Sequence, residues 1–224
     1  MTRPLLEICV DSIAAARAAC DGGADRLELC AALDLDGLTP DVTFVGEVRG
    51  QVAVPLMVMV RPRGGGFTYD ASELTVMESQ AHEMRAAGAD GIVFGCVCAD
   101  GGVDREATER LIDAARPLPV TFHRALDGVP DPFAALDVLL DLGVDRVLTS
   151  GGPGPAHHHR DALRQLVLRA GDLLAIMPGG GVRADNVVDT VRTSHALEVH
   201  SSAGLGSDPD PDRVAALIKA LDTI

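Results

Sequence analysis

Eight short runs of aliphatic and β-branched residues recur along the chain. They begin near Leu5, Arg26, Leu56, Gly91, Pro119, Arg146, Leu173 and Ala196. Segments between them show helical periodicity, for example 12–20, 72–87, 132–142 and 162–168. Strand and helix patterns therefore alternate, which predicts a parallel sheet connected by helical crossovers. Eight such units with no segment left over favour an α/β fold of the closed (β/α)8 type over an open doubly wound sheet.

One short motif occurs three times, each time just before a predicted strand. Its copies are Gly23-Ala24-Asp25, Gly88-Ala89-Asp90 and Gly143-Val144-Asp145. In each copy the glycine can end a helix in the left-handed conformation, and a short turn leads into a buried strand. We expect these turns at the bottom of the barrel, where they serve stability. No linker or low-complexity segment divides residues 1–224, which predicts a single domain.

Composition narrows the range of partners and compartments. The 224 residues carry a formal net charge of −14, which argues against binding to nucleic acid or to an anionic membrane surface. No apolar run approaches the ~20 residues of a membrane span, and the first residues show no secretory leader pattern. The five cysteines are an odd number without a disulfide framework. Reduced thiols and a cytoplasmic location are therefore expected.

Ionisable side chains gather at the carboxyl ends of the predicted strands. Residues two apart in a strand share one side, so Glu7 lies on the side of Cys9 and Glu28 on the side of Cys30. A carboxylate costs less in the mouth of the barrel than beneath the helices. We therefore expect one pocket, and its candidate acid–base groups are Glu7, Glu28, His123, Glu198 and His200. The alternative is a layer of mutually paired charges without chemistry.

Glycines and arginines at the same end predict an anion site. Glycine-rich loops after strands seven and eight of a barrel commonly bind phosphate through backbone N–H groups. The alternative for such a loop is a tight turn. The candidate anion-binding residues are Arg61, Arg63, Arg124, Gly179, Gly180, Gly181, Arg183, Ser201 and Ser202.

Six ordered motifs resemble the CutC family, which is named for copper homeostasis. They are 6–12 (LEICVDS), 23–30 (GADRLELC), 61–65 (RPRGG), 119–125 (PVTFHRA), 146–151 (RVLTSG) and 198–203 (EVHSSA). The resemblance covers nearly the whole chain. It implies a cytoplasmic barrel of the TIM type that associates as a homo-oligomer.

The resemblance also implies a copper site, because the family's copper proposal rests on two cysteines that match Cys9 and Cys30. Both residues end neighbouring strands on the same face, and two thiolates suit Cu(I). The alternative is inert packing, since free cysteine often acts as a small buried hydrophobe.

Three features depart from the family pattern or are not required by it. Cys96 and Cys98 form a C-x-C pair after the fourth strand that can join the thiol site or be a local substitution, whereas Cys20 lies in a helix and is expected to pack. The run 157–159 (HHH) is expected to be a solvated helix start. After Ala203 the chain passes through 204–207 (GLGS) to its last helix, where relatives have a longer loop.

The sequence is compatible with three functions. The first is a copper-handling protein that binds Cu(I) through Cys9 and Cys30. The second is an acid–base enzyme, a lyase, isomerase or hydrolase, acting on a small phosphorylated or carboxylated metabolite. A Schiff-base mechanism is disfavoured, because the single lysine, Lys219, belongs to the final helix. The third is a metabolite-binding barrel without catalysis.

Overall fold

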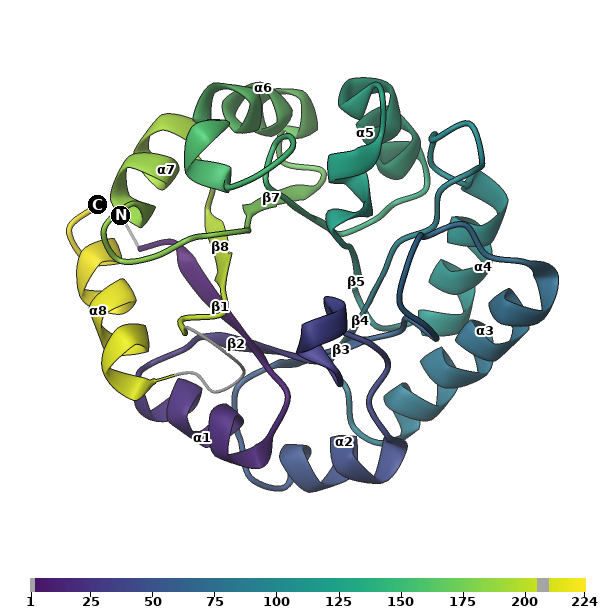
Figure 1. Cartoon of the computed structure of the whole chain (residues 1–224), viewed down its shortest axis with the longest axis horizontal. Coiled ribbons are helices and arrows are strands. Elements are labelled where there is room, and N and C mark those ends of the chain that lie inside the picture. The colour runs from purple at the N-terminus through teal and green to yellow at the C-terminus, as the bar shows by residue number, and fades with distance from the viewer. Residues whose placement is uncertain (1–2, 205–209) are drawn as a thin grey trace.

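Strands and helices alternate around a closed ring. A computed structural model describes residues 3–204 and 210–224, and Figure 1 shows the view down the barrel, with the helices outside the strands. The strands are β1 Leu5–Val10, β2 Arg26–Leu29, β3 Leu56–Met59, β4 Gly91–Phe94, β5 Val120–Phe122, β6 Arg146–Thr149, β7 Ala175–Pro178 and β8 Glu198–Ser201. The helices are α1 Ile13–Asp21, α2 Val42–Arg49, α3 Ala71–Ala86, α4 Arg105–Ala115, α5 Pro132–Asp141, α6 Arg160–Ala170, α7 Val187–Ser194 and α8 Pro211–Leu221. The predicted (β/α)8 barrel is confirmed.

The sheet is parallel, and its neighbours follow one another in chain order. Hydrogen-bonded strands run β7-β6-β5-β4-β3-β2-β1-β8, and β7 and β8 lie side by side and complete the ring. Opposite Glu7 of β1 stand Arg26 of β2 on one side and His200 of β8 on the other. The register therefore brings charged residues from the two ends of the chain to the same level of the barrel.

The repeated turn motif has a second function that the glycine alone does not indicate. Gly23, Gly88 and Gly143 adopt φ values of +93°, +100° and +71°, as the motif predicts. The aspartate that follows two residues later accepts a hydrogen bond from the backbone of the preceding strand. Asp25 accepts from Leu6 N (2.8 Å), Asp90 from Leu56 N (2.9 Å) and Asp145 from Val120 N (2.8 Å). These aspartates tie adjacent strands together at the bottom of the barrel.

Polar side chains, most of them aspartates, cap the amino termini of most of the helices. A side-chain oxygen of Ser12, Asp41, Asp70, Asp104, Asp131 or Asp210 accepts from the backbone of the first helical turn. An anion at a helix amino terminus satisfies free N–H groups and interacts favourably with the helix dipole. Part of the strongly negative charge thus stabilises the helices.

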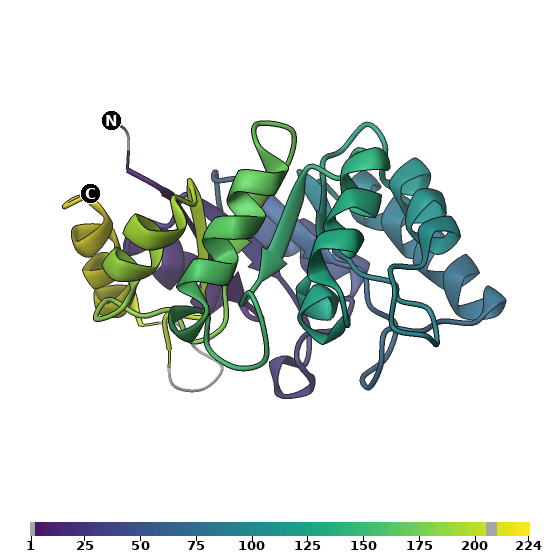
Figure 2. The same ribbon diagram turned by 90° about the horizontal axis from the view of Figure 1, so that it is seen from above.

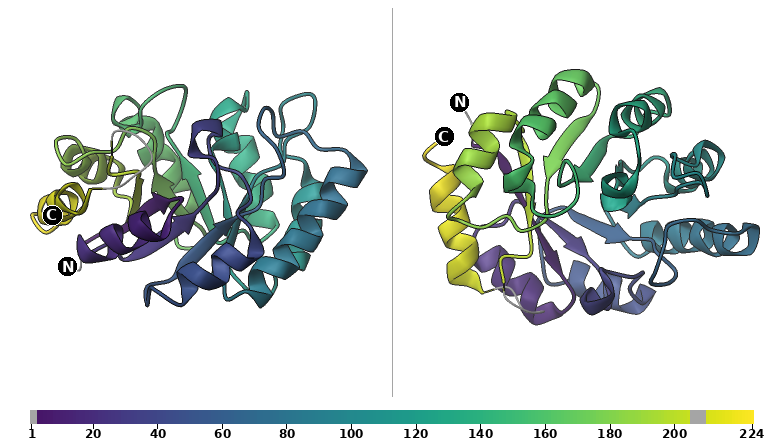
Figure 3. Two further views of the ribbon diagram at one scale, coloured as in Figure 1. Left: turned by 60° about the horizontal axis from the view of Figure 1, so that its bottom comes forward. Right: turned by 45° about the horizontal axis from the view of Figure 1, so that its top comes forward.

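A loop connection lies over the mouth of the barrel. Figure 2 shows the barrel from the side, and the tilted views of Figure 3 show the same outer belt of helices around the strands. The β2–α2 connection contains a short 3-10 helix, η1 (Leu33–Leu35), which lies over the mouth. Arg61 holds this connection, since its guanidinium donates to the carbonyls of Leu35 (2.7 Å) and Gly37 (3.0 Å). No helix of the described residues is long and apolar enough to cross a membrane.

Candidate functional site

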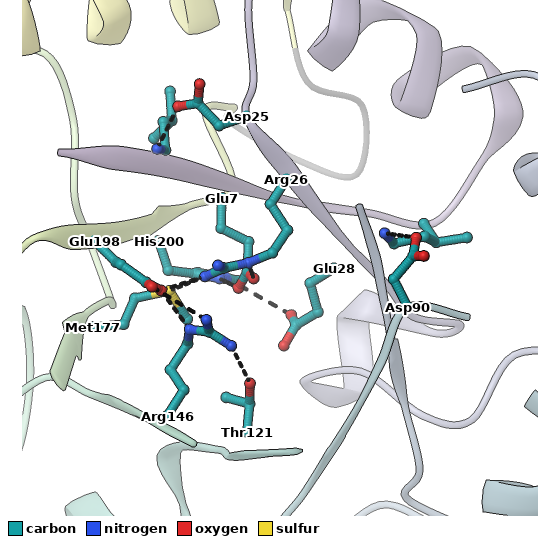
Figure 4. A network of polar contacts seen from close by, with 12 residues as sticks. Glu7, Asp25, Arg26, Glu28, Asp90, Thr121, Arg146, Met177, Glu198 and His200 are labelled. Carbon is teal, nitrogen blue, oxygen red and sulfur yellow. Dashed lines mark hydrogen bonds and ion pairs between the residues drawn. The ribbon is translucent and has the colours of Figure 1, made fainter. Parts of the chain in front are cut away.

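A network of paired charged side chains fills the lower part of the barrel interior. The guanidinium of Arg26 binds Glu7 and also donates to Glu198 at 2.6 Å. Arg146 donates to the other oxygen of Glu198 at 3.1 Å (Figure 4). Because every charged side chain in this network has a partner of opposite charge, the network can exist in the interior without an uncompensated charge.

This network of charged side chains continues toward the mouth of the barrel, from Glu7 to His200. The Nδ1 of His200 donates to Oε1 of Glu7 at 2.8 Å, and its Nε2 lies 3.8 Å from Oε2 of Glu28. All three side chains are buried and come from the adjacent strands β8, β1 and β2. The hydrogen bond to Glu7 fixes the ring orientation and leaves Nε2 facing Glu28.

Two thiols lie directly beside these groups. The Sγ atoms of Cys9 and Cys30 are 3.9 Å apart, and Sγ of Cys30 is 3.6 Å from Oε2 of Glu28. The two cysteines belong to a small apolar cluster with Met57, Met59 and Val93. Gly37 closes over this cluster with φ +85°, and a Cβ at this position would lie 3.1 Å from Sγ of Cys30. The β2–α2 connection can approach the thiol this closely because residue 37 is glycine.

Mutual contact shifts the pKa values within the cluster. The hydrogen bond with Cys30 lowers the pKa of Cys9 to about 6, with help from His200 and against the effect of burial. The same contact and burial raise the pKa of Cys30 well above its usual range. Burial also raises the pKa of Glu28. Cys9 is therefore the thiolate of the cluster, and the neighbouring Cys30 and Glu28 retain their protons.

His200 and Glu7 form an ion pair inside the barrel. Burial would lower the pKa of His200, but Glu28, Cys9 and Glu7 together raise it well above its usual value. For Glu7, burial is outweighed by His200 and Arg26, which lower the pKa to about 2. The imidazole is therefore protonated near neutral pH and its carboxylate partner is ionised.

The cluster faces a cavity of about 540 Å³ at the mouth of the barrel. Its lining includes Cys9, Glu28, Arg61, His123, Arg124, Gly180, Gly181, His200, Ser201 and Ser202. Arg124 approaches Gly180 so closely that a Cβ there would lie 3.2 Å from its Cζ. The structure thus brings most of the predicted acid–base, thiol and anion-binding residues to one cavity.

His123 differs from His200 in its charge. Burial and the nearby Arg61 lower the pKa of His123 to about 3, so the ring is neutral at physiological pH. Its Nδ1 accepts from the backbone N–H of Ala125 at 3.2 Å, which leaves the proton on Nε2. Among the described residues, this Nε2 and Nε of Arg61 lack a hydrogen-bond partner. His123 can therefore donate a hydrogen bond to a ligand but is a poor base.

Several predicted site residues lie away from the cavity lining. Glu198 is at the start of β8, below the cavity, where Arg26 and Arg146 bind it. Arg63 donates to Gly66 O (2.9 Å) and Thr68 O (2.8 Å) and thereby shapes its own loop. Arg183 lines a second cavity with Arg213, near α8. Gly179 packs below the lining, where a Cβ would meet Leu148 and His200.

The sequence features outside the main motifs also have definite positions. Cys96 belongs to the main apolar core and Cys98 is half-buried; neither joins the Cys9–Cys30 cluster. The rings of His157 and His158 meet edge to face with centroids 4.2 Å apart, and Nδ1 of His159 is 3.2 Å from Pro155 O. The shortened segment after Ala203 falls largely on residues 205–209, which lie outside the described residues.

Some interior residues were not singled out by the sequence. Arg26 and Arg146 stand at predicted strand starts, and Met57 and Met59 follow the strand start at Leu56. Strand alternation could have identified Arg26 as an interior residue. Arg26 precedes Glu28 by two positions and therefore lies on the same side of its strand as Glu28 and Cys30.

The fold and the mouth together define a class: a TIM-type barrel with a buried cluster of thiols, carboxylates and imidazole beneath a polar cavity. Residues 4–205 match the model of the CutC family, and the chain belongs to that family. It is 45% identical over 199 residues to the copper homeostasis protein cutC homolog of Homo sapiens, covering 89% of this chain and 73% of that one. A family protein CutC of Caulobacter vibrioides is 42% identical over 210 residues, covering 92% and 85%.

A solved structure supports the same assignment. The crystal structure of the putative copper homeostasis protein CutC from Streptococcus agalactiae superposes with a TM-score of 0.85 at 30% sequence identity. The match covers 89% of this chain and 98% of that one. The chain is therefore a homologue of the CutC copper homeostasis proteins.

Proposed function

We propose that this protein handles copper by binding Cu(I) between the sulfur atoms of Cys9 and Cys30. The observation that carries the proposal is the 3.9 Å separation of two buried thiols on neighbouring strands. A metal–thiolate bond is about 2.3 Å long, so a single ion can contact both sulfurs at this separation. Soft thiolate ligands favour Cu(I) over harder ions.

The surroundings of the two thiols fit this ion. Met57, Met59 and Val93 pack around the sulfurs and keep hard oxygen donors away on that side. Cys9 lines the cavity, which gives an ion a path from solvent. The low pKa of Cys9, about 6, supplies one thiolate near neutral pH. Binding of the ion then displaces the proton of Cys30.

An anaerobic titration against a chromophoric Cu(I) chelator tests the proposal. The wild-type protein is expected to take up one equivalent of Cu(I), and the double variant Cys9→Ser/Cys30→Ser to take up none. The matched control is Cys96→Ser/Cys98→Ser, which removes the same number of thiols and should bind like wild type. Stoichiometric Cu(I) in the Cys9→Ser/Cys30→Ser protein would refute the proposal.

A second candidate function is acid–base catalysis on a small phosphorylated or carboxylated metabolite. It is favoured by the hydrogen-bonded pair Glu7–His200, because His200 lines a cavity that Arg61 and Arg124 also line. A carboxylate that orients an imidazole is a common element of proton-transfer sites. Lys219, the single lysine, is exposed on α8, so an imine with the protein is not part of this candidate.

Binding and turnover assays separate this candidate from a non-catalytic metabolite-binding barrel. Sugar phosphates and small carboxylic acids are first tested for stabilisation of the protein against heat. A compound that stabilises it is then incubated with wild type and with His200→Gln. Catalysis predicts turnover by wild type that His200→Gln lacks, whereas binding without any turnover contradicts it.

A further inference from the structure

The main cavity has a donor wall, formed by Arg61, His123 and Arg124, that binding of Cu(I) to two sulfurs leaves unused. Arg61 is buried, and its guanidinium donates to three neutral backbone carbonyls at 2.7, 3.0 and 2.9 Å. Its remaining donor, Nε, has no hydrogen-bond partner among the described residues. Because its acceptors are neutral, the buried guanidinium keeps a positive charge that its own contacts do not compensate.

The donor wall extends across the barrel from Cys9. His123 and Arg124 follow β5, which lies four strands away from β1 in the ring (Figure 1). Phe67 connects His123 to Arg61, since its ring centroid lies 4.7 Å from that of the imidazole and 4.9 Å from Cζ of the guanidinium. The neutral imidazole adds an unpartnered Nε2–H, and the side chain of Arg124 is exposed. Positive charge and N–H donors therefore face the thiol side of the cavity.

The carboxylates around the cavity leave this charge largely in place. Asp127 binds the other arginine of the wall at 2.8 Å, and Glu28 lies 3.8 Å from Nε2 of His200. Asp36 lines the cavity from an exposed position. None of these three carboxylates forms an ion pair with Arg61. An anion in the cavity would thus meet an uncompensated cation away from bulk water, where their attraction is strong.

A bare copper ion does not account for such a cavity. Its volume of about 540 Å³ suits a small organic molecule, whereas an ion between two sulfurs fills only a small part of it. The donor wall would also repel a free cation. Thiolates are the ligands that hold Cu(I), and a thiol that bears a carboxylate has the negative charge that arginine binds well.

We propose that the donor wall binds the carboxylate of a small organic thiol, which delivers Cu(I) to Cys9 and Cys30 as its thiolate complex. The inference rests on the copper proposal for the ion and adds the carrier and its binding site. The transfer is a ligand exchange in which copper remains Cu(I). The bond from copper to a carrier sulfur breaks, a bond to a cysteine sulfur forms, and any proton on the cysteine passes to the released carrier sulfur.

Mercaptosuccinate, added without copper to the reduced full-length protein, tests the donor wall alone. It is expected to raise the midpoint of thermal unfolding in a saturable manner, whereas the neutral thiol 2-mercaptoethanol is not. Arg124→Gln should lose this shift. The matched control is Arg169→Gln, which also breaks an exposed pair with an aspartate and should respond like wild type. No shift in wild type, or the same shift in folded Arg124→Gln, would overturn the proposal.

Copper uptake tests the role of the carrier. Stopped-flow absorbance follows transfer of Cu(I) to reduced wild type from its complex with mercaptosuccinate and from its complex with 2-mercaptoethanol. Both are measured at about 0.15 M salt, where charges more than ~8 Å away are largely screened. Uptake from the anionic complex should be about tenfold faster, and Arg124→Gln should lose this difference. Equal rates in wild type would refute the carrier.

The two experiments separate this inference from the copper proposal. The thermal shift contains no copper, so its failure leaves the chelator titration of Cys9 and Cys30 unaffected. A positive shift together with a failed titration would instead refute copper binding and leave the anion site in place.

Discussion

Nδ1 of His200 lies 2.8 Å from Oε1 of Glu7, although the two residues are separated by 193 positions in the chain. The contact joins β8 to β1, where the first and last strands of the barrel pair. It also connects the ion pairs of the lower interior to the thiol cluster at the mouth. One buried hydrogen bond therefore contributes both to closing the barrel and to orienting His200 toward Glu28.

Replacing Glu7 should destabilise the protein strongly. Glu7→Gln removes the buried carboxylate that pairs with His200 and Arg26, and breaking a buried pair costs about 3–5 kcal/mol, although Arg26 keeps its contact with Glu198. Urea unfolding measures the free energy of unfolding. The control Asp137→Asn breaks the exposed pair with Arg169 and should cost about 1 kcal/mol or less. Equal losses in the two variants would contradict the importance of the interior network.

The aspartates of the repeated turns should stabilise the protein through their hydrogen bond to the preceding strand. Asp145 is the cleanest case, because Asp25 and Asp90 also bind arginines. Asp145→Ala should lower the free energy of unfolding by about 1–3 kcal/mol, since the N–H of Val120 loses its acceptor. Asp145→Asn keeps an acceptor oxygen and should lose less. An alanine variant as stable as wild type in urea unfolding would contradict the assignment.

His123 should make the protein less stable as the pH falls. Its pKa is about 3 in the folded protein and about 6.5 when exposed, so between these values only the unfolded chain binds the proton. Stability is therefore retained above pH 6.5 and falls with acidification, by up to about 1.4 kcal/mol per pH unit. His123→Gln should show a shallower decline than wild type when urea unfolding is followed from about pH 7 to 5. Parallel declines would show that His123 titrates normally.

Thiol reactivity should distinguish Cys9 from Cys96. The pKa of Cys9 is lowered to about 6, mainly by Cys30, whereas burial raises the pKa of Cys96. Cys9 also lines the cavity. Iodoacetamide at neutral pH should therefore modify Cys9 well before Cys96, and peptide mass spectrometry locates the label. Preferential labelling of Cys96 would contradict this order.

The fold was predictable because its signals are local and repeated. Eight apolar strands along the chain leave few alternatives, and the repeated glycine turns mark where three of the units begin. The role of Asp25, Asp90 and Asp145 was not predictable from spacing alone, because each carboxylate binds a backbone group of a strand far away in the sequence.

Which residues belong to the candidate site was more predictable than which of them contact one another. Strand alternation placed Cys9 and Glu28 on the inner face, and both line the cavity. The same alternation does not give the height of a residue in the barrel, which is why Glu198 was grouped with the mouth although it lies below it. Height follows from the register of β8 against β1, where Glu198 stands opposite Leu5 and His200 opposite Glu7.

The position of bound copper tests the central claim most directly. Crystals of the reduced protein loaded with one equivalent of Cu(I) under anaerobic conditions would be measured at the copper absorption edge. One anomalous peak is expected, within bonding distance of Sγ of both Cys9 and Cys30. A peak elsewhere, for example at His157 and His158, with no density between the two sulfurs would contradict it.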